Sequence, residues 1–182
     1  MTDDGESWLV MVTRLPTEPA RHRMAVWREL RRAGAVPLGQ GTWALPDVPA
    51  VALLVGRLDA LAEAAAGTVL ILRADGLREA DRARLAQLYD EARQQEWAEF
   101  NADCEKYLAE LDKEERIGKF TLAELEEEEQ SLDRLRRWCR ELRARDLSGN
   151  RAGTDGIASL KRCQERFDGY AEQVYAVLGG SA

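Results

Sequence analysis

The strongest constraint on the fold is a long stretch, residues 77–112, that contains neither glycine nor proline. Its apolar side chains recur every three or four positions, and such positions share one face of an α-helix. The pattern therefore predicts one long helix with an apolar stripe facing a core. The stripe consists of Leu85, Leu88, Ala92, Phe100, Cys104, Leu108 and Leu111.

Two further helices are predicted after the long one. Thr121 followed by Glu124 is a capping-box pattern, in which the two side chains satisfy free backbone N–H groups at a helix start. A loop is expected over 146–156, where serine, glycine and asparagine cluster, and Thr154 or Asp155 is expected to cap the last helix. Both helices have apolar residues at a/d spacing, which favours an antiparallel pair with the long helix as a third member.

The first seventy-five residues have a different pattern, in which short apolar segments alternate with glycine and proline. Thr17 is expected to cap a first helix that buries Met24, Trp27 and Leu30. Trp27 and Trp43 could stack on bases, but their spacing favours core packing. Pro37 predicts that its strand lies at a sheet edge. Strand, helix, two strands, helix and strand are expected over residues 8–13, 19–33, 35–38, 42–45, 48–66 and 68–72.

These patterns together predict an α+β protein. Residues 1–75 are expected to form a ferredoxin-like β-α-β-β-α-β domain, with two helices on one face of an antiparallel sheet. Residues 76–182 are expected to form an antiparallel helical bundle of about three helices. The second face of the sheet must then be covered by another element or serve as an interface.

The chain is short of the side chains that most catalytic and metal sites require. It has one histidine, His22, and three widely spaced cysteines, Cys104, Cys139 and Cys163. This excludes a disulfide framework and a zinc ribbon, and it gives little support to a His-ligated metal or a Ser-His-Asp triad. We expect no enzyme activity, no metal and no cofactor. The cysteines are interpreted as buried thiols, with a redox or oxyanion sensor as the alternative.

Charge and hydropathy narrow the class of partner. No apolar segment is long enough to span a membrane, and the N-terminus is acidic where a signal peptide is basic, so a cytoplasmic protein is expected. The net charge of −7 disfavours nucleic acid as a partner for the average surface. Polyanion binding nevertheless depends on local basic patches.

Two arginine clusters supply such patches. A guanidinium group is always charged and can bind two phosphate oxygens at once, which makes both clusters candidate DNA-binding surfaces. The alternative is a solvated helix face whose charges complement the helix dipole. The candidates are Arg21, Arg23, Arg28, Arg31 and Arg32 in the first cluster, and Arg136, Arg137, Arg140 and Arg143 in the second.

Nine segments resemble the N-terminal domain of the ChrB family of chromate-resistance regulatory proteins. They are Trp8–Val10, Leu15–Ala20, Arg23–Leu30, Gly34–Ala35, Leu45–Pro46, Glu105–Leu108, Lys119–Glu127, Leu135–Trp138 and Arg143–Asp146. The resemblance covers nearly the whole chain, and the L-P-T-x-P-A segment followed by R-M-x-V-W-R is its most specific part.

The resemblance implies a transcription regulator that binds promoter DNA of a chromate-efflux operon. It assigns DNA binding to the region of the first arginine cluster. The family's additional C-terminal domain, which is associated with the chromate response, is expected to be absent, so an oxyanion effector stays open. We expect a DNA-binding regulator or accessory factor that forms a homodimer. The alternative is a protein-interaction or oligomeric structural module without nucleic-acid binding.

Overall fold

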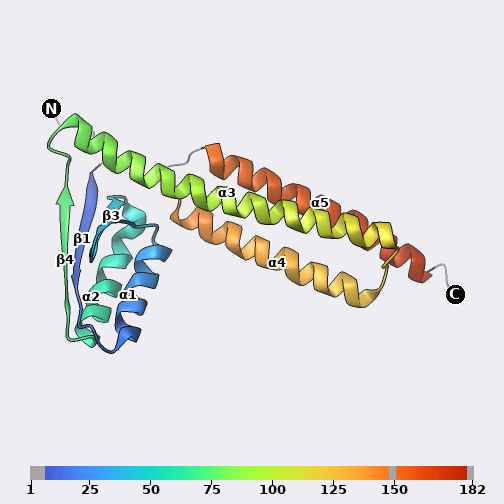
Figure 1. Ribbon diagram of the computed structural model, residues 1–182, viewed down its shortest axis with the longest axis horizontal. Coiled ribbons are helices and arrows are strands. Elements are labelled where there is room, and N and C mark those ends of the chain that lie inside the picture. Colours follow the sequence, from blue (N-terminus) through green and yellow to red (C-terminus); the bar gives the residue numbers. More distant parts are fainter. Residues whose placement is uncertain (1–6, 148–150, 180–182) are drawn as a thin grey trace. The chain divides into compact units, whose positions relative to one another are not determined.

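The computed structural model describes residues 7–147 and 151–179. The chain is α+β and mostly helical, as predicted, and it forms two compact units that divide between Ala92 and Arg93. A short 3₁₀ turn, Pro49–Val51, precedes α2. The strands and α-helices are β1 Trp8–Arg14, α1 Ala20–Arg32, β2 Val36–Gly39, β3 Thr42–Pro46, α2 Ala52–Ala64, β4 Thr68–Ala74, α3 Glu79–Ile117, α4 Leu122–Arg145 and α5 Arg151–Gly179 (Figure 1).

The four strands form one antiparallel sheet in the order β2-β3-β1-β4. Strand β1 is central, and its Val10 lies between Ala44 of β3 and Leu72 of β4. Strand β2 lies at the edge, which confirms the expectation from Pro37. A proline has no N–H to donate, so an edge strand tolerates it.

Helices α1 and α2 lie side by side over one face of this sheet (Figure 1). Thr13 and Trp43 line a cleft together with Val26 of α1, which identifies the helix-covered face. Met11 and Leu45 point to the same face, because alternate residues of a strand share a side, and both are fully buried.

The opposite face of the sheet is only partly covered. At one end Trp8 packs edge-on against Tyr89 of α3, with ring centroids 5.9 Å apart. Farther along, Leu70 and Leu72 of β4 are 56% and 46% exposed. They flank Val12 and Val10, their half-buried partners on β1. The first unit therefore presents an apolar strip on its open sheet face.

Helix α1 differs from the prediction in its start and its buried side. Its N-cap is Pro19, without a side-chain capping bond, so Thr17 does not cap the helix. Val26 and Leu30 are the buried residues, whereas Met24 and Trp27 are 48% and 45% exposed. Residue 27 lies about 100° from position 26 and about 60° from position 30, to one side of the buried stripe, so Trp27 reaches the surface.

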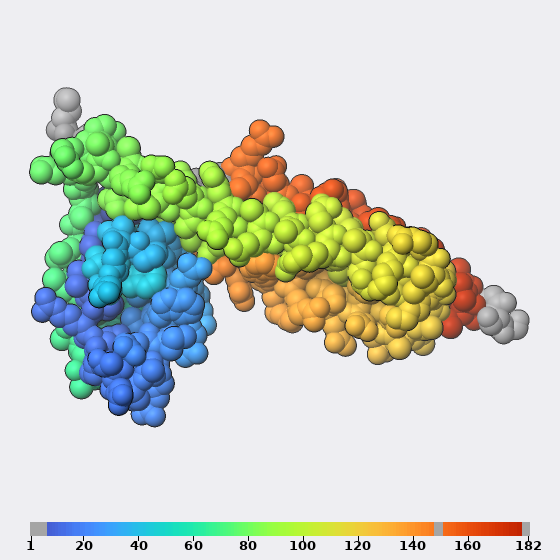
Figure 2. Space-filling view, in the orientation of Figure 1, coloured from blue at the N-terminus to red at the C-terminus, as the bar shows by residue number. Residues whose placement is uncertain are grey.

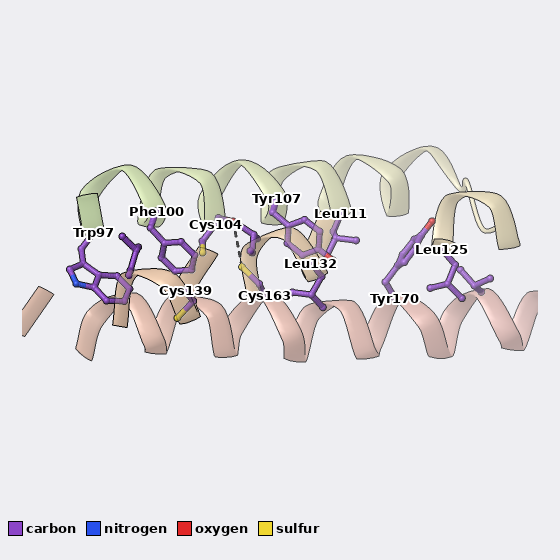
Figure 3. Close-up of a cluster of buried hydrophobic side chains, with 13 residues drawn as sticks. Trp97, Phe100, Cys104, Tyr107, Leu111, Leu125, Leu132, Cys139, Cys163 and Tyr170 are labelled. Atoms are coloured by element: carbon purple, nitrogen blue, oxygen red, sulfur yellow. Dashed lines mark hydrogen bonds between the residues drawn. The ribbon is translucent and has the colours of Figure 1, made fainter. Parts of the chain in front are cut away.

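One buried cluster organises the second unit (Figure 3). Helix α3 contributes side chains including Trp97 and Phe100, α4 contributes Leu132 and Cys139, and α5 contributes Cys163, among others. The capping expectation for α4 is confirmed in its first half, because Thr121 Oγ1 accepts a hydrogen bond of 3.3 Å from the backbone N–H of Glu124. The Glu124 carboxylate itself forms an ion pair with Lys119.

The loop expected over 146–156 is wrong in its second half. Helix α5 already runs from Arg151, so Thr154 and Asp155 lie inside it rather than at its cap; residues 148–150 lie outside the described part of the chain. A Cβ built on Gly156 would come within 2.3 Å of the Trp97 ring, and one on Gly153 within 3.5 Å. Gly153 and Gly156, which were interpreted as loop residues, therefore lie inside α5, where the absence of a side chain leaves space for the Trp97 indole.

This contact predicts opposite effects for the same substitution at two glycines of α5. Gly156→Ala should destabilise the protein by about 1–3 kcal/mol, because the methyl group overlaps a fully buried ring. Gly169→Ala, which has open space around the new Cβ, should stabilise it by up to about 1 kcal/mol through helix propensity. Urea unfolding followed by circular dichroism measures both. Equal effects of the two substitutions would contradict the assigned contact.

Candidate functional site

The arginines of the first cluster lie on α1, which has five arginines and one carboxylate, Glu29. Arg32 forms an ion pair of 2.9 Å with that carboxylate. Arg21, Arg23 and Arg28 are exposed, and no carboxylate among the described residues is within ion-pair distance of them. The helix therefore presents a cationic surface on an acidic protein.

Sequence reasoning missed a contribution from α2 to this surface. Arg57 lies beside α1 because the two helices pack together, and its guanidinium makes a 3.1 Å ion pair with Glu29. The single carboxylate of α1 is thus shared by Arg32 and Arg57 and cannot neutralise both. Nothing in the local pattern around Arg57 pointed to this, because the pairing joins residues 28 positions apart.

A cleft of about 750 Å³ opens beside the same helix. Arg14 and Arg23 line it together with Trp27, Gln40 and Trp43, and none of the described residues that line it is acidic. The Arg31 guanidinium lies 6.0 Å from the centre of the Trp27 ring, a distance at which cation–π attraction operates. The cleft thus combines cationic, aromatic and amide side chains.

The turn between β2 and β3 fixes one rim of this cleft. Gly41 has φ of +70°, and a Cβ at that position would lie 2.7 Å from the carbonyl oxygen of Thr13. The Gly41 carbonyl accepts hydrogen bonds from both the backbone N–H and the hydroxyl of Thr13, at 2.7 and 3.1 Å. Only glycine fits this close approach without strain, so the rim is rigidly held.

The structure divides the second arginine cluster. Arg137, Arg140 and Arg143 are exposed on α4, as predicted, but Arg136 is half-buried and forms a 2.9 Å ion pair with Asp133. Three of the four candidates on α4 therefore stand free for an anion in the described part of the chain. The α1 and α4 clusters belong to different units.

All three cysteines are buried in the second unit, as interpreted from the sequence. The thiol of Cys163 donates to the backbone oxygen of Cys104 at 3.6 Å, so Cys163 pairs with α3 rather than with Cys139 of α4 (Figure 3). The interaction between the two thiols and then burial raise the pKa of Cys104, whereas the same thiol–thiol interaction lowers the pKa of Cys163. Burial raises the pKa of Cys139 as well, which disfavours its reactive thiolate form.

A second hollow, of about 810 Å³, lies between α3 and α4 and has a different character. It is lined mainly by charged side chains, among them Glu128, which is only 5% exposed. Burial, reinforced by the charges of Glu110, Glu127, Glu114 and Glu124, raises the pKa of Glu128 to about 7. The Tyr107 hydroxyl donates to the backbone oxygen of Glu128 at 3.3 Å, so this bond leaves the carboxyl group unpaired.

Two features are absent from residues 7–147 and 151–179. No group of three or more histidine, cysteine, aspartate or glutamate side chains there is arranged to hold a metal ion. No helix of that part combines the length and the apolar character needed to cross a bilayer.

The comparisons with known proteins identify the family. The profile described as "Protein ChrB, N-terminal" matches residues 23–181. The chain belongs to the ChrB N-terminal family. Protein ChrB of Cupriavidus metallidurans is 31% identical over 94 residues, which make up 52% of this chain and 28% of that protein. The resemblance seen in the sequence is therefore confirmed, and no solved structure matches the chain.

The region matched by the ChrB family includes most of the candidate DNA-binding arginines. Its first residue is Arg23, so it includes Arg28, Arg31 and Arg32 of α1 but leaves out Arg21. All four candidates of the second cluster lie within it, and so does Glu128. The aligned region thus spans parts of both units.

The raised pKa of Glu128 predicts a dependence of stability on pH. The folded state holds a proton that the unfolded chain releases near pH 4.5, so stability falls as pH rises from about 4.5 to 7, by about 3 kcal/mol. Glu128→Gln keeps the shape without the ionisation. It should match the parent protein near pH 4.5 and exceed its unfolding free energy by about 3 kcal/mol at pH 8.

Denaturant unfolding at both pH values tests this, with Glu129→Gln as the control. Glu129 is the exposed neighbour on the same helix and does not line the hollow. The control should keep the parent's pH profile. An unchanged profile for Glu128→Gln would mean that this carboxyl group is not held in its neutral form.

Proposed function

We propose that this chain is a DNA-binding regulatory protein linked to chromate resistance, and that α1 and its neighbouring cleft contact the phosphate backbone. The observation behind this proposal is that Arg21, Arg23 and Arg28 are exposed on α1 and have no carboxylate partner among the described residues. Membership of the ChrB family supports the regulatory role, because the resemblance to that family implies a chromate-resistance regulatory protein.

Local electrostatics make such a contact compatible with a net charge of −7. Salt screens charges beyond about 8–10 Å, so a phosphate group near α1 interacts mainly with the arginines beside it. Guanidinium groups bind phosphate oxygens in pairs, and neutralised phosphates release counterions into solution. Affinity should therefore depend strongly on salt.

The cleft beside α1 would add aromatic and amide contacts with DNA to the ionic contacts with phosphate. The half-exposed indole of Trp27 lies between Arg23 and Arg31, and Gln40 and Trp43 lie across the cleft. An aromatic ring beside guanidinium groups can pack against a sugar or an exposed base, which is how many nucleic-acid proteins supplement phosphate contacts. We infer a binding role without catalysis, exercised in the cytoplasm where the operator DNA lies.

We further infer that the first unit is a ferredoxin-like domain and the second a three-helix bundle. The strand order β2-β3-β1-β4 with two helices over one face supports the first inference. A buried cluster shared by α3, α4 and α5 supports the second.

A homodimer is proposed as well, with the strip of Val10, Val12, Leu70 and Leu72 on the open sheet face as its contact. We also propose that an oxyanion such as chromate is the effector that regulates DNA binding.

The DNA proposal predicts a specific effect of reversing two charges. Arg21→Glu with Arg28→Glu should weaken binding to the chain's own promoter DNA at least tenfold at low salt. It should also reduce the slope of log affinity against log salt by about 2, because roughly one counterion is released per phosphate contact. Fluorescence anisotropy across a salt series measures both quantities.

The control reverses two arginines elsewhere. Arg116→Glu with Arg151→Glu makes the same change of net charge at exposed positions outside both clusters. It should leave affinity within about twofold and keep the slope. If both double variants lose affinity equally, binding follows total charge, and the assignment to α1 fails.

The dimer proposal predicts an effect of one leucine on the open sheet face. Leu72→Glu should convert the protein to monomers in light scattering, because it puts a charge into the apolar strip. Leu53→Glu on α2, where the parent leucine is 76% exposed on the helical side, should leave the assembly unchanged. A parent protein that is monomeric at micromolar concentration would contradict the proposed dimer.

The alternative function, a protein-interaction module, draws on the same strip. It would be favoured if Leu72→Glu removes assembly while the arginine reversals leave DNA retention unchanged. The two experiments together therefore separate a nucleic-acid role from a structural one.

A further inference from the structure

We propose that the hollow between α3 and α4 is a binding site for a small aliphatic diamine or polyamine, with the Glu128 carboxylate as its anchor. The site lies in the second unit, and the proposal does not depend on DNA binding by α1. Figure 2 shows α3, in green to yellow, beside α4, in orange, on one face of that unit.

The first argument is the state of Glu128. Glu128 is only 5% exposed as a residue, and its one side-chain contact by hydrogen bond, from Tyr107, goes to its backbone oxygen, so no described side chain pairs with its carboxyl group. An unpaired buried carboxylate is costly unless a cation or hydrogen-bond donor meets it. The carboxyl group lines the hollow, so a ligand in the hollow can reach it.

The second argument is that the lysines around the hollow are already engaged. Lys106 pairs with Asp103 at 2.6 Å, Lys113 with Glu110 at 2.7 Å, and Lys119 with Glu124 at 2.7 Å. Lys113 and Lys119 also lie 3.7 and 3.4 Å from the two carboxylate oxygens of Glu114. The cations of the site are therefore held by other carboxylates.

The remaining charges favour a ligand with two positive groups. Glu127 lines the hollow next to Glu128 and has no ion pair within the described chain. Arg134, the other cation at the rim, donates to Ser131 Oγ at 2.9 Å. When Glu128 is ionised, the lining has six carboxylates against four cations, a surplus of two negative charges. A diamine would balance that surplus.

The shape and the wall of the hollow favour an organic cation over a metal ion. No cluster of metal-ligating side chains occurs among the described residues, so a compact divalent ion lacks its ligand set. The volume of about 810 Å³ is in the range of small-molecule sites. Tyr107, Leu135 and Trp138 add apolar and aromatic wall, against which a methylene chain can pack and which attracts ammonium groups.

Isothermal titration of the full chain with putrescine and spermidine, at low salt and without DNA, tests the proposal. We expect saturable binding with one ligand per chain. Glu128→Gln should weaken it at least tenfold, whereas Glu129→Gln should change it less than twofold. Both variants remove one charge from adjacent positions of α4, so only their location differs. Circular dichroism checks that both remain folded.

Magnesium chloride at matched ionic strength is the ligand control. The proposal expects no comparable saturable binding of Mg²⁺. It is overturned if neither amine binds saturably, if both variants lose affinity equally, or if Mg²⁺ binds as well as putrescine. Each of these results would reduce the hollow to part of a diffuse acidic surface. None of them bears on α1, so the two proposals fail separately.

Discussion

The second unit depends on how closely α5 approaches α3, and that approach is set by the contact of Trp97 with Gly156. The indole of Trp97 is 1% exposed, so its apolar surface is buried. Its Nε1–H donates a hydrogen bond to Asp146 at 2.8 Å, so its polar group is paired as well. A side chain on Gly156 would push the helices apart at this point. Because cores are close-packed, such a shift would spread along the pair.

The close approach of α5 to α3 continues in further contacts along α5 toward its C-terminal end. Cys163 reaches the backbone of Cys104, and the Tyr170 hydroxyl donates to the carbonyl of Lys119 at 2.7 Å. Outside the core, Arg162 pairs with Glu105, and Arg166 pairs with Asp112 and Glu115. Exposed ion pairs of this kind contribute little stability each, so they fix register rather than hold the helices together. The same backbone position of Lys119 places its ammonium group beside the carboxylates of the hollow.

How much the sequence predicted depended on whether a signal was local. The long helix, the Thr121 cap and the edge position of Pro37 all follow from spacing or backbone chemistry, and all are confirmed. Gly153 and Gly156 were misread because a glycine in a turn and a glycine under an indole look alike in a sequence. Trp97, the partner that distinguishes them, is more than fifty residues away.

The candidate sites show the same division between local and distant signals. The arginines of α1 are visible in the sequence as a cluster, but the share of Arg57 in it depends on helix packing. The exposure of Trp27 was missed because the spacing of Met24, Trp27 and Leu30 was interpreted as a buried stripe, whereas the buried residues of α1 are Val26 and Leu30. Glu128 stands in a run of glutamates, Glu126–Glu129, in which nothing local distinguishes it from its neighbours. Only its burial by α3 separates it from Glu129.

The cleft beside α1 and the hollow between α3 and α4 have opposite electrostatic character. In the first unit, cations gather where carboxylates are few, and solvent can screen them at little cost. In the second, a carboxyl group is buried among other carboxylates, which raises its pKa and lowers the stability of the folded state as pH rises from about 4.5 to 7. A glutamine of the same shape would avoid that cost. The proposed amine ligand would offset that cost, because its ammonium group would stabilise the ionised carboxylate.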